Sequence, residues 1–304
     1  MSKIKIYLEE LRAPFFTGSV VPVALGSAIA WAGSGRFHWV WFLLTVIGAT
    51  AMHAGANIAN DYWDHVSGCD EANREFVRPF TVGSRVIQNG LMTPREVLLE
   101  ALLMYAAALV IGVYFITVRG PFILLLGLIG AFSGFFYTAP PLKLVHRGIG
   151  EIFIGLNFGV LLTLGAFYVQ AGYAAWEPVV ASIPVALLIT AVLYINEFQD
   201  YNADKSVGKN NWVVQLGKER AVLGLAIMMA LVYLSIVAGV VCKIITPWTL
   251  LALLTAPLAI KAVLVARKNF GDSKALAPAN AATIGAHLAT GVALTLAYLL
   301  HRLI

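Results

Sequence analysis

Long apolar segments alternate with short polar ones along nearly the whole chain, and this pattern predicts a helical membrane protein. A transmembrane helix needs about 20 mostly apolar residues. Nine segments meet or approach this length: 14–32, 39–60, 96–117, 121–138, 149–171, 178–197, 220–241, 246–266 and 279–300. The fourth is short and is stopped by Pro140-Pro141. We therefore expect an all-α polytopic membrane protein, with nine transmembrane helices around a central cavity and a single domain over residues 1–304.

The composition agrees with this expectation. Hydrophobic residues make up 60% of the 304 positions and charged residues 12%, whereas a soluble domain carries about 25% charged residues. The net charge of +5 is accounted for by basic loops on one side of a membrane, so we expect a lipid bilayer and no nucleic acid as partner. Cys69 and Cys242 match no zinc spacing and are expected to be free thiols. The first twelve residues lack the apolar core of a signal peptide.

The distribution of Lys and Arg predicts the orientation, because cytoplasmic loops carry an excess of both. With a cytoplasmic N-terminus, 17 of the 21 Lys and Arg residues fall on the cytoplasmic side and 4 on the other side. We therefore expect a multi-pass protein of the cell's inner (cytoplasmic) membrane. Any site at the cytoplasmic helix ends would open to the cytoplasm.

Two acidic stretches run from Asn57 to Asp70 and from Asn196 to Lys209, and each closes an apolar segment. Together they contain six of the 16 acidic residues. Each precedes a long polar connection, and long connections are where function concentrates. The order of helix, Asn/Asp-rich end, basic loop and two further helices occurs twice. This suggests two pseudo-repeat halves, roughly 1–140 and 141–304, whose acidic sets would face each other across the cavity.

Helical spacing places the polar residues of each stretch on one face, because residues three or four apart are neighbours on a helix. One predicted stripe holds Asn57, Asn60, Asp61 and Asp64, and the other holds Asn196, Asp200 and Asp204, with Glu197 nearby. Carboxylates without thiols or a His array suit Mg²⁺, which usually completes its coordination with water and phosphate. The expected ligand is therefore a phosphate or diphosphate. Two other interpretations of the acidic stripes remain. The acids could be helix-end charges that pair with loop cations, or the protein could be a transporter whose carboxylates form a cation site.

Basic residues near the acidic stretches can complete a diphosphate site, since Arg and Lys both bind phosphate. The candidates are Arg74, Arg78, Arg85, Lys143, Arg147, Lys205 and Lys209. Solvated loop charges are the alternative for several of them. Tyr137 ends the fourth segment and fits either an interfacial anchor or a polar group of the site. His53 is expected to be a hydrogen-bonded core histidine.

These motifs resemble those of the UbiA superfamily of intramembrane aromatic prenyltransferases. Asn60-Asp61-Tyr62-Trp63-Asp64 is similar to the first aspartate-rich motif, and Asp200-Tyr-Asn-Ala-Asp204 with the following lysines to the second. Tyr137-Thr-Ala-Pro-Pro-Leu-Lys143 is similar to the central loop of the family, and Arg12-Ala-Pro14 also matches. The resemblance covers almost the whole chain.

One departure from the family pattern bears on the acceptor. The last position of the first motif is Gly68, and the acid comes two residues later, at Asp70. Together with the segment Gly83-Ser-Arg-Val-Ile-Gln88, this departure resembles the branch that prenylates 1,4-dihydroxy-2-naphthoate in the biosynthesis of menaquinone, an isoprenoid quinone. Prenylation of 4-hydroxybenzoate, homogentisate or a glycerol phosphate lipid precursor remains the alternative within the family.

The resemblance implies an enzyme that uses Mg²⁺ to transfer a prenyl group from a polyprenyl diphosphate to an aromatic acceptor. The implied metal-binding residues are Asn60, Asp64, Asp70, Asp200 and Asp204, supported by Asn57, Asp61 and Asn196. The residues expected at the phosphate oxygens are Lys143, Arg78, Lys209 and Tyr137, with Lys205 beside them. Arg85 or Arg12 would hold an acceptor carboxylate.

Overall fold

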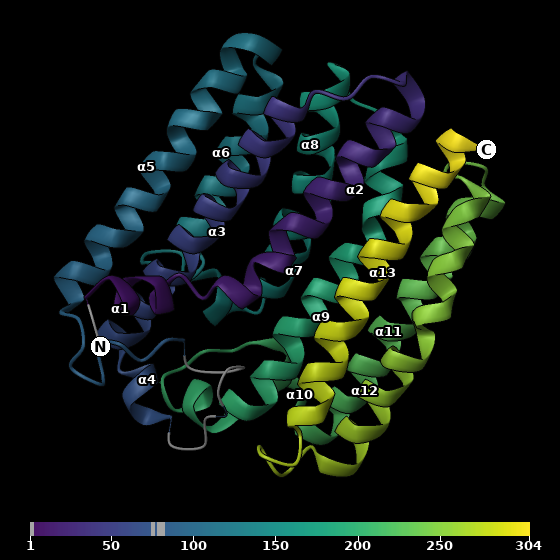
Figure 1. The fold of residues 1–304 in the computed structure, drawn as a ribbon. Helices are drawn as coiled ribbons and strands as arrows, with labels where there is room; N and C mark the ends of the chain where they lie inside the picture. Colours follow the sequence, from purple (N-terminus) through teal and green to yellow (C-terminus); the bar gives the residue numbers. More distant parts are fainter. Residues whose placement is uncertain (1–2, 74–76, 78–82) are drawn as a thin grey trace.

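The structure, a computed structural model, describes residues 3–73, 77 and 83–304, and it is helical without a β-strand in this part of the chain (Figure 1). The first half contains α1 (Lys3–Glu10), η1 (Ala13–Phe16), α2 (Thr17–Ser34), α3 (Trp39–Ser67), α4 (Cys69–Ala72), α5 (Pro94–Arg119) and α6 (Phe122–Phe135). The second half contains η2 (Leu144–Arg147), α7 (Gly150–Gly155), η3 (Leu156–Leu161), α8 (Leu162–Ala171), α9 (Trp176–Ser206), α10 (Trp212–Leu216), α11 (Lys218–Val241), η4 (Pro247–Thr255), α12 (Ala256–Asn269) and α13 (Ala277–Leu303).

Eight helical runs in the described residues are long and apolar enough to cross a membrane, so the expected count of nine is not confirmed. The difference is the segment predicted at 121–138. It forms α6, which has 14 residues and is therefore about 21 Å long, less than the roughly 30 Å of a bilayer core. The helix ends before Pro140 and Pro141, which lack the backbone N–H that a continuing helix needs.

The two helices that carry the acidic motifs extend further than predicted. α3 continues to Ser67 and α9 to Ser206, with 29 and 31 residues. Asp61 and Asp64 therefore lie on the last turns of α3 and Asp200 and Asp204 on those of α9, whereas Asp70 lies on the short helix α4. α3 stops at Gly68, whose φ of 76° is the left-handed conformation that commonly ends a helix.

Close helix contacts are made at small residues. A Cβ added to Gly26 of α2 would lie 2.1 Å from the Thr163 carbonyl oxygen of α8, and one on Gly159 would lie 2.3 Å from the Ala186 Cβ of α9. Small residues at such crossings let helix backbones approach within a membrane. They hold α2 against α8, and η3 against α9.

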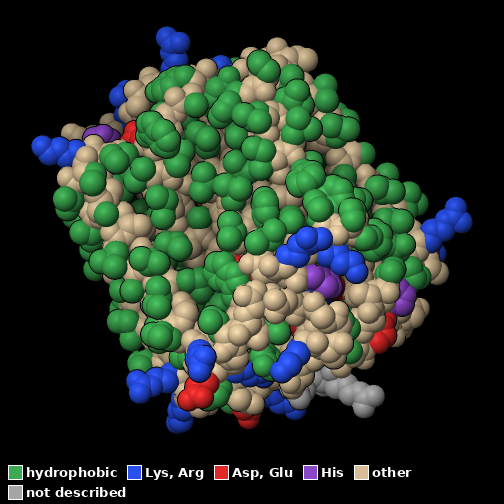
Figure 2. Space-filling model, turned by 180° about the vertical axis from the view of Figure 1, so that it is seen from behind, with side chains coloured by type: hydrophobic (Ala, Val, Ile, Leu, Met, Phe, Trp, Pro, Cys, Tyr) green, Lys and Arg blue, Asp and Glu red, His purple; other side chains and the backbone are tan. Residues whose placement is uncertain are grey.

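By contrast, α6 is packed loosely, and Ser133 is its one buried residue. In Figure 2, hydrophobic side chains cover most of the visible face, and most charged side chains lie around its margins, many of them at the lower edge. This distribution is typical of a protein whose flanks contact lipid.

Candidate active site

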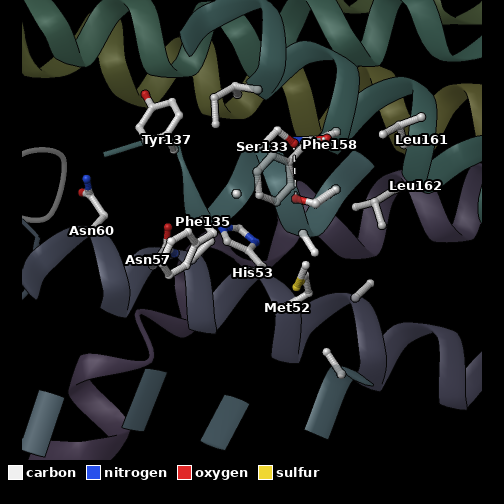
Figure 3. Close-up of a pocket in the computed structure, with 18 of the residues that line it drawn as sticks. Met52, His53, Asn57, Asn60, Ser133, Phe135, Tyr137, Phe158, Leu161 and Leu162 are labelled. Carbon is white, nitrogen blue, oxygen red and sulfur yellow. Dashed lines mark hydrogen bonds between the residues drawn. The ribbon is translucent and has the colours of Figure 1, made fainter. Parts of the chain in front are cut away.

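One cavity of about 750 Å³ lies inside the helix bundle. Its walls come from α3, α5, α6, the run from α7 to α8, and α9, and most of the lining is apolar. In Figure 3, Asn57 and Asn60 of α3 point into the same space as Tyr137 and Phe158 on the opposite side. The polar residues of the lining come mainly from the acidic ends of α3 and α9.

The carboxylates of the two helices meet at a single lysine. Asp64 Oδ1 of α3 is 2.8 Å from the Nζ atom of Lys209, and Asp204 Oδ1 of α9 is 3.6 Å from the same Nζ atom. Asp70 and Asp200 line the cavity as well. The two acidic stretches, far apart in the sequence, therefore do face each other.

The α9 carboxylates are held by two asparagines, Asn73 and Asn211, which the sequence motifs did not indicate. Asn73 Nδ2 donates to Asp200 Oδ1 at 2.6 Å, and Asn211 Nδ2 donates to Asp204 Oδ2 at 2.8 Å. The thiol of Cys69 lies 3.4 Å from Asp204 Oδ1. Asn211 is also the N-cap of α10. This capping position before an apolar run is the signal by which the sequence could have indicated it.

Asp61 does not belong with the other residues of its predicted stripe. Its Oδ2 accepts hydrogen bonds from the backbone N–H and the hydroxyl of Ser84 at 2.8 and 2.9 Å, and its Oδ1 is 3.6 Å from Arg12 Nη1. It is absent from the cavity lining. Asp61 lies about 100° around the helix from Asn60, so it faces the following loop. Gly83 permits this contact, because a Cβ there would lie 2.1 Å from Asp61 Oδ1.

The predicted cations are placed very differently from one another. Lys209 and Arg12 line the main cavity. Lys143 lines a separate pocket of about 110 Å³ that it shares with Asp64. Arg85 lies outside the cavity and donates from Nη1 to the Asp70 carbonyl oxygen at 3.0 Å. Lys205 is exposed, with its Nζ 5.6 Å from the centre of the Tyr201 ring.

Arg74 and Arg78 lie outside the described residues. Among the predicted amide and phenol groups, Asn57, Asn60, Asn196 and Tyr137 all line the cavity. His53 lies within hydrogen-bonding distance of Ser19, with its Nδ1 2.9 Å from the Ser19 Oγ, and it also faces the cavity.

The local electrostatics reflect a concentration of buried acids. Burial lowers the pKa of Lys209, but Asp64 and Asp204 outweigh it and raise that pKa well above its ordinary value. Burial, followed by repulsion from Asp64 and Asp61, raises the pKa of Asp70 to about 9. A cation at this end of the cavity would therefore be strongly favoured.

The donor groups fit a divalent cation with oxygen ligands. No group of three or more His, Cys, Asp or Glu in the described residues is close enough to hold a metal ion by itself. Mg²⁺ commonly takes only one or two protein carboxylates, however, and obtains the rest from water and phosphate. The Lys209 ammonium group between Asp64 and Asp204 shows that these two carboxylates can share one cation.

A pair of polar residues in the apolar part of the cavity was not indicated by any motif. The run from α7 to α8 contains a π-helical segment, η3, and such segments are frequent at functional sites. Asn157 of η3 donates from Nδ2 to Ser133 Oγ of α6 at 2.7 Å. This polar contact connects the loosely packed α6 to the second half of the chain.

Residues 19–284 match the UbiA prenyltransferase family. The chain belongs to this family. It is therefore an enzyme that transfers prenyl groups, and not the transporter of the alternative interpretation. The resemblance of the motifs to this family is confirmed.

Several relatives are named as prenyl- or phytyltransferases of a naphthoate or a naphthoquinone. The chain is 29% identical to the 1,4-dihydroxy-2-naphthoate octaprenyltransferase of Bacillus subtilis, over 83% of this chain and 79% of the relative. It is 32% identical to the enzyme of the same name from Mycobacterium tuberculosis, over 82% and 85%. It is 28% identical to the 2-carboxy-1,4-naphthoquinone phytyltransferase of Synechocystis, over 85% and 81%.

Solved structures agree on the fold. A UbiA homolog from Archaeoglobus fulgidus, bound to DMAPP and Mg²⁺, superimposes with a TM-score of 0.60 over 95% of this chain and 98% of the other, at 19% identity. A UbiA homolog from Aeropyrum pernix K1 gives a TM-score of 0.66 over 93% and 98%, at 15% identity. The all-helical membrane fold is thus the fold of the family.

Proposed function

We propose that this prenyltransferase transfers a prenyl group from a polyprenyl diphosphate to 1,4-dihydroxy-2-naphthoate, and that the transfer depends on Mg²⁺. The observation that carries the proposal is the meeting of Asp64 with Asp200 and Asp204 at one end of a largely apolar cavity. A polyprenyl diphosphate has the same division into a charged head and an apolar tail. The named relatives support the choice of acceptor.

In this proposal, the diphosphate lies between the ends of α3 and α9. Asp64, Asp200 and Asp204 hold Mg²⁺, and Asn60 and Asp70 stand beside them in the lining. The bound metal would neutralise charge on the diphosphate as it leaves. Asn73 and Asn211 keep the α9 carboxylates oriented through the hydrogen bonds described above.

Lys209 has two roles in the proposal. Without metal, its ammonium group neutralises Asp64 and Asp204. With metal and donor bound, it is free to contact the diphosphate oxygens, where a cation stabilises the developing charge. Tyr137 lines the same region and is placed to donate a hydrogen bond to the diphosphate.

The prenyl tail occupies the apolar part of the cavity between α3, α5 and α6. Gly127 and Gly130 of α6 line this part, and a Cβ at either position would meet no atom within 4 Å. The apolar walls exclude water from the allylic carbon, which protects a developing carbocation from hydrolysis. The acceptor ring then reacts as the carbon nucleophile, with its carboxylate directed toward Arg12.

We further propose that the N-terminus and the acidic ends of α3 and α9 face the cytoplasm, in the inner membrane of the cell. The excess of Lys and Arg on that side supports this orientation. The two halves of the single domain, roughly 1–140 and 141–304, each contribute one acidic helix to the site.

The proposal is tested by incubating purified protein with labelled farnesyl or geranylgeranyl diphosphate. The acceptors are dihydroxynaphthoate, 4-hydroxybenzoate and homogentisate, each with Mg²⁺ or with EDTA. We expect product with dihydroxynaphthoate alone, lost in EDTA and in Asp64→Ala and Asp200→Ala. Product with another acceptor would overturn the acceptor assignment, and product in EDTA would overturn the dependence on Mg²⁺.

A further inference from the structure

A chain of amide groups inside the protein leads from α13 to the cavity. Asn280 of α13 is buried, and its Nδ2 donates to Oδ1 of Asn196 on α9 at 2.7 Å. The same nitrogen donates to Gln199 Oε1 at 3.2 Å, and Gln199 Nε2 donates to the Ser273 carbonyl oxygen at 2.7 Å. Of the three side chains, only Asn196 lines the cavity. The network therefore connects a helix outside the cavity to one polar group of its lining.

The network has a fixed polarity because it ends on a backbone carbonyl group. A carbonyl oxygen can only accept a hydrogen bond, so Gln199 must turn its nitrogen toward Ser273 and its oxygen toward Asn280. Asn280 must then present its nitrogen, since its own oxygen would otherwise face the oxygen of Gln199. Asn196 must in turn present its oxygen to Asn280. The hydrogen bonds thus determine which way each amide is turned.

The amide of Asn196 consequently offers a hydrogen-bond donor to the cavity. Its Oδ1 is engaged by Asn280, which lies outside the cavity, and this leaves the Nδ2 group for a ligand. An amide nitrogen donates hydrogen bonds and does not accept them, whereas Mg²⁺ is bound by oxygen atoms. Asn196 is thus suited to an oxygen atom of a bound substrate and not to the metal ion.

Asn196 lies where the lining contributed by α9 changes from apolar to acidic. Ile189, Val192 and Leu193 line the cavity before it. Asp200 follows one turn later, about 6 Å along the helix axis. In the proposed function, the prenyl tail lies on the apolar side of this boundary and the diphosphate on the acidic side. The oxygen atom that joins the two parts of the substrate therefore comes next to Asn196.

We propose that Asn196 donates a hydrogen bond to the oxygen atom that joins the diphosphate to the prenyl carbon, and that Asn280 is the positioning residue for its amide; this inference rests on the proposed function. The bond between that oxygen and the prenyl carbon breaks, and its electron pair stays on the diphosphate. Negative charge therefore develops on the oxygen that Asn196 contacts. A donor oriented in advance stabilises this charge more than the uncharged ester oxygen of the bound substrate, so it raises kcat.

The first test replaces the N–H₂ group of Asn196 by an acceptor. Asn196→Asp keeps an oxygen atom for the contact with Asn280 and presents a second oxygen to the cavity. We expect kcat to fall about 100-fold or more, the range for loss of one preorganised donor. A residue that bound Mg²⁺ through oxygen would tolerate this change, because carboxylates are good ligands of Mg²⁺. Retained activity of Asn196→Asp would therefore overturn the proposal.

The second test removes the group that orients the amide. Asn280→Ala leaves Asn196 in place, and we expect kcat to fall at least about tenfold, because a misplaced group loses most of its effect. The KM for the acceptor should change less than about threefold. The dissociation constant of the unreactive farnesyl thiolodiphosphate with Mg²⁺ should change equally little. A rise in either constant that matches the loss of rate would assign the contact to substrate binding and overturn the proposal.

Thr290→Val is the matched control for Asn280→Ala. Thr290 is a buried residue of the same helix, lies outside the cavity, and forms a hydrogen bond between its Oγ1 and that of Thr255 at 2.7 Å. Both substitutions remove a buried hydrogen bond between α13 and a neighbouring element. The kcat of Thr290→Val should equal that of wild type. An equal fall of kcat in both variants would give Asn280 a merely structural role and overturn the proposal.

A double variant shows whether Asn280 acts through Asn196. In the Asn196→Ala background, Asn280→Ala should lower kcat less than about twofold further, because the amide that it orients is absent. A further loss as large as that in wild type would contradict the positioning role. Product formation by wild type tests the proposed function, and the ratios of variant to wild type test Asn196 and Asn280. The two failures are therefore distinguishable.

Discussion

At the scale of single residues, the site is held together by the partners of its buried acids. Asp64 and Asp204 share Lys209, Asp200 accepts a hydrogen bond from Asn73, and Asp61 accepts two hydrogen bonds from Ser84. Buried carboxylates without partners are costly. These partners therefore hold the carboxylates of the site in place before any ligand binds.

Replacing Lys209 by Met should destabilise the metal-free protein. Removing one partner of a buried ion pair costs about 3–5 kcal/mol, because Asp64 and Asp204 would lose their shared cation. We expect a lower melting temperature in EDTA, and a larger rise on adding Mg²⁺ than in wild type. Lys205→Met is the control, since Lys205 is exposed. Equal melting of Lys209→Met and wild type in EDTA would contradict this account of the lysine.

At the scale of helices, the architecture depends on close crossings on one side of the cavity and loose packing on the other. α2 and α8 approach closely at Gly26, whereas in α6 only Ser133 is buried, and it accepts a hydrogen bond from Asn157 of η3. The first arrangement gives a rigid wall. The second leaves room for a long apolar tail.

Gly26 and Gly33 of α2 provide a matched test of the rigid wall. Gly26→Ala should lower the free energy of unfolding by about 1–3 kcal/mol, because the added methyl group would meet the Thr163 carbonyl oxygen. Gly33→Ala meets no atom within 4 Å and should be neutral or stabilising, since Ala favours helix over Gly by about 1 kcal/mol. Thermal unfolding in detergent measures both. Equal effects of the two substitutions would contradict the close crossing.

The opposite wall predicts donor selectivity. Gly127→Phe should fill part of the space beside α6 and lower kcat/KM for octaprenyl diphosphate at least about tenfold. The value for geranyl diphosphate should stay within about twofold. Gly271→Phe is the control, because a Cβ there also meets no atom within 4 Å and the residue lies outside the cavity. An equal loss for both donors would show that the tail does not lie along α6.

The helical periodicity of the sequence predicted the two acidic faces well, and it failed where tertiary packing chooses between neighbouring faces. Asn57, Asn60 and Asp64 line the cavity as expected, but Asp61 turns to the loop at Ser84. Periodicity alone cannot separate these positions, because adjacent faces of a helix overlap. The count of nine spans is not confirmed, because the segment predicted at 121–138 forms the 14-residue helix α6.

The loop cations were the least predictable part of the site. Lys205 and Lys209 are four residues apart, yet one is exposed and the other is 7% exposed and contacts two carboxylates. The difference arises after α9 ends, where Gly208 adopts a φ of 75° and turns the chain back toward the cavity. A positive φ at one glycine is set by the whole turn and is not visible in the spacing of charges.

At the scale of the whole molecule, we propose that both acidic helix ends face the cytoplasm. The two cysteines allow a test of this orientation. Cys242 is exposed at the end of α11 and can be labelled, whereas Cys69 is buried beside the site. A membrane-impermeant maleimide added to intact cells should label Cys242. The variant Cys242→Ser should remain unlabelled. Labelling only in permeabilised cells would put Cys242 on the cytoplasmic side and contradict the proposed orientation.

The central claim is that carboxylates from α3 and α9 act together on one diphosphate. The most direct test is calorimetric binding of the unreactive farnesyl thiolodiphosphate, with Mg²⁺, to wild type, Asp64→Asn, Asp204→Asn and the double variant. We predict that each single substitution weakens binding at least about tenfold, and that the double variant loses much less than the product of the two, since both residues serve one site. Independent losses that multiply, or binding unchanged in either single variant, would contradict the account.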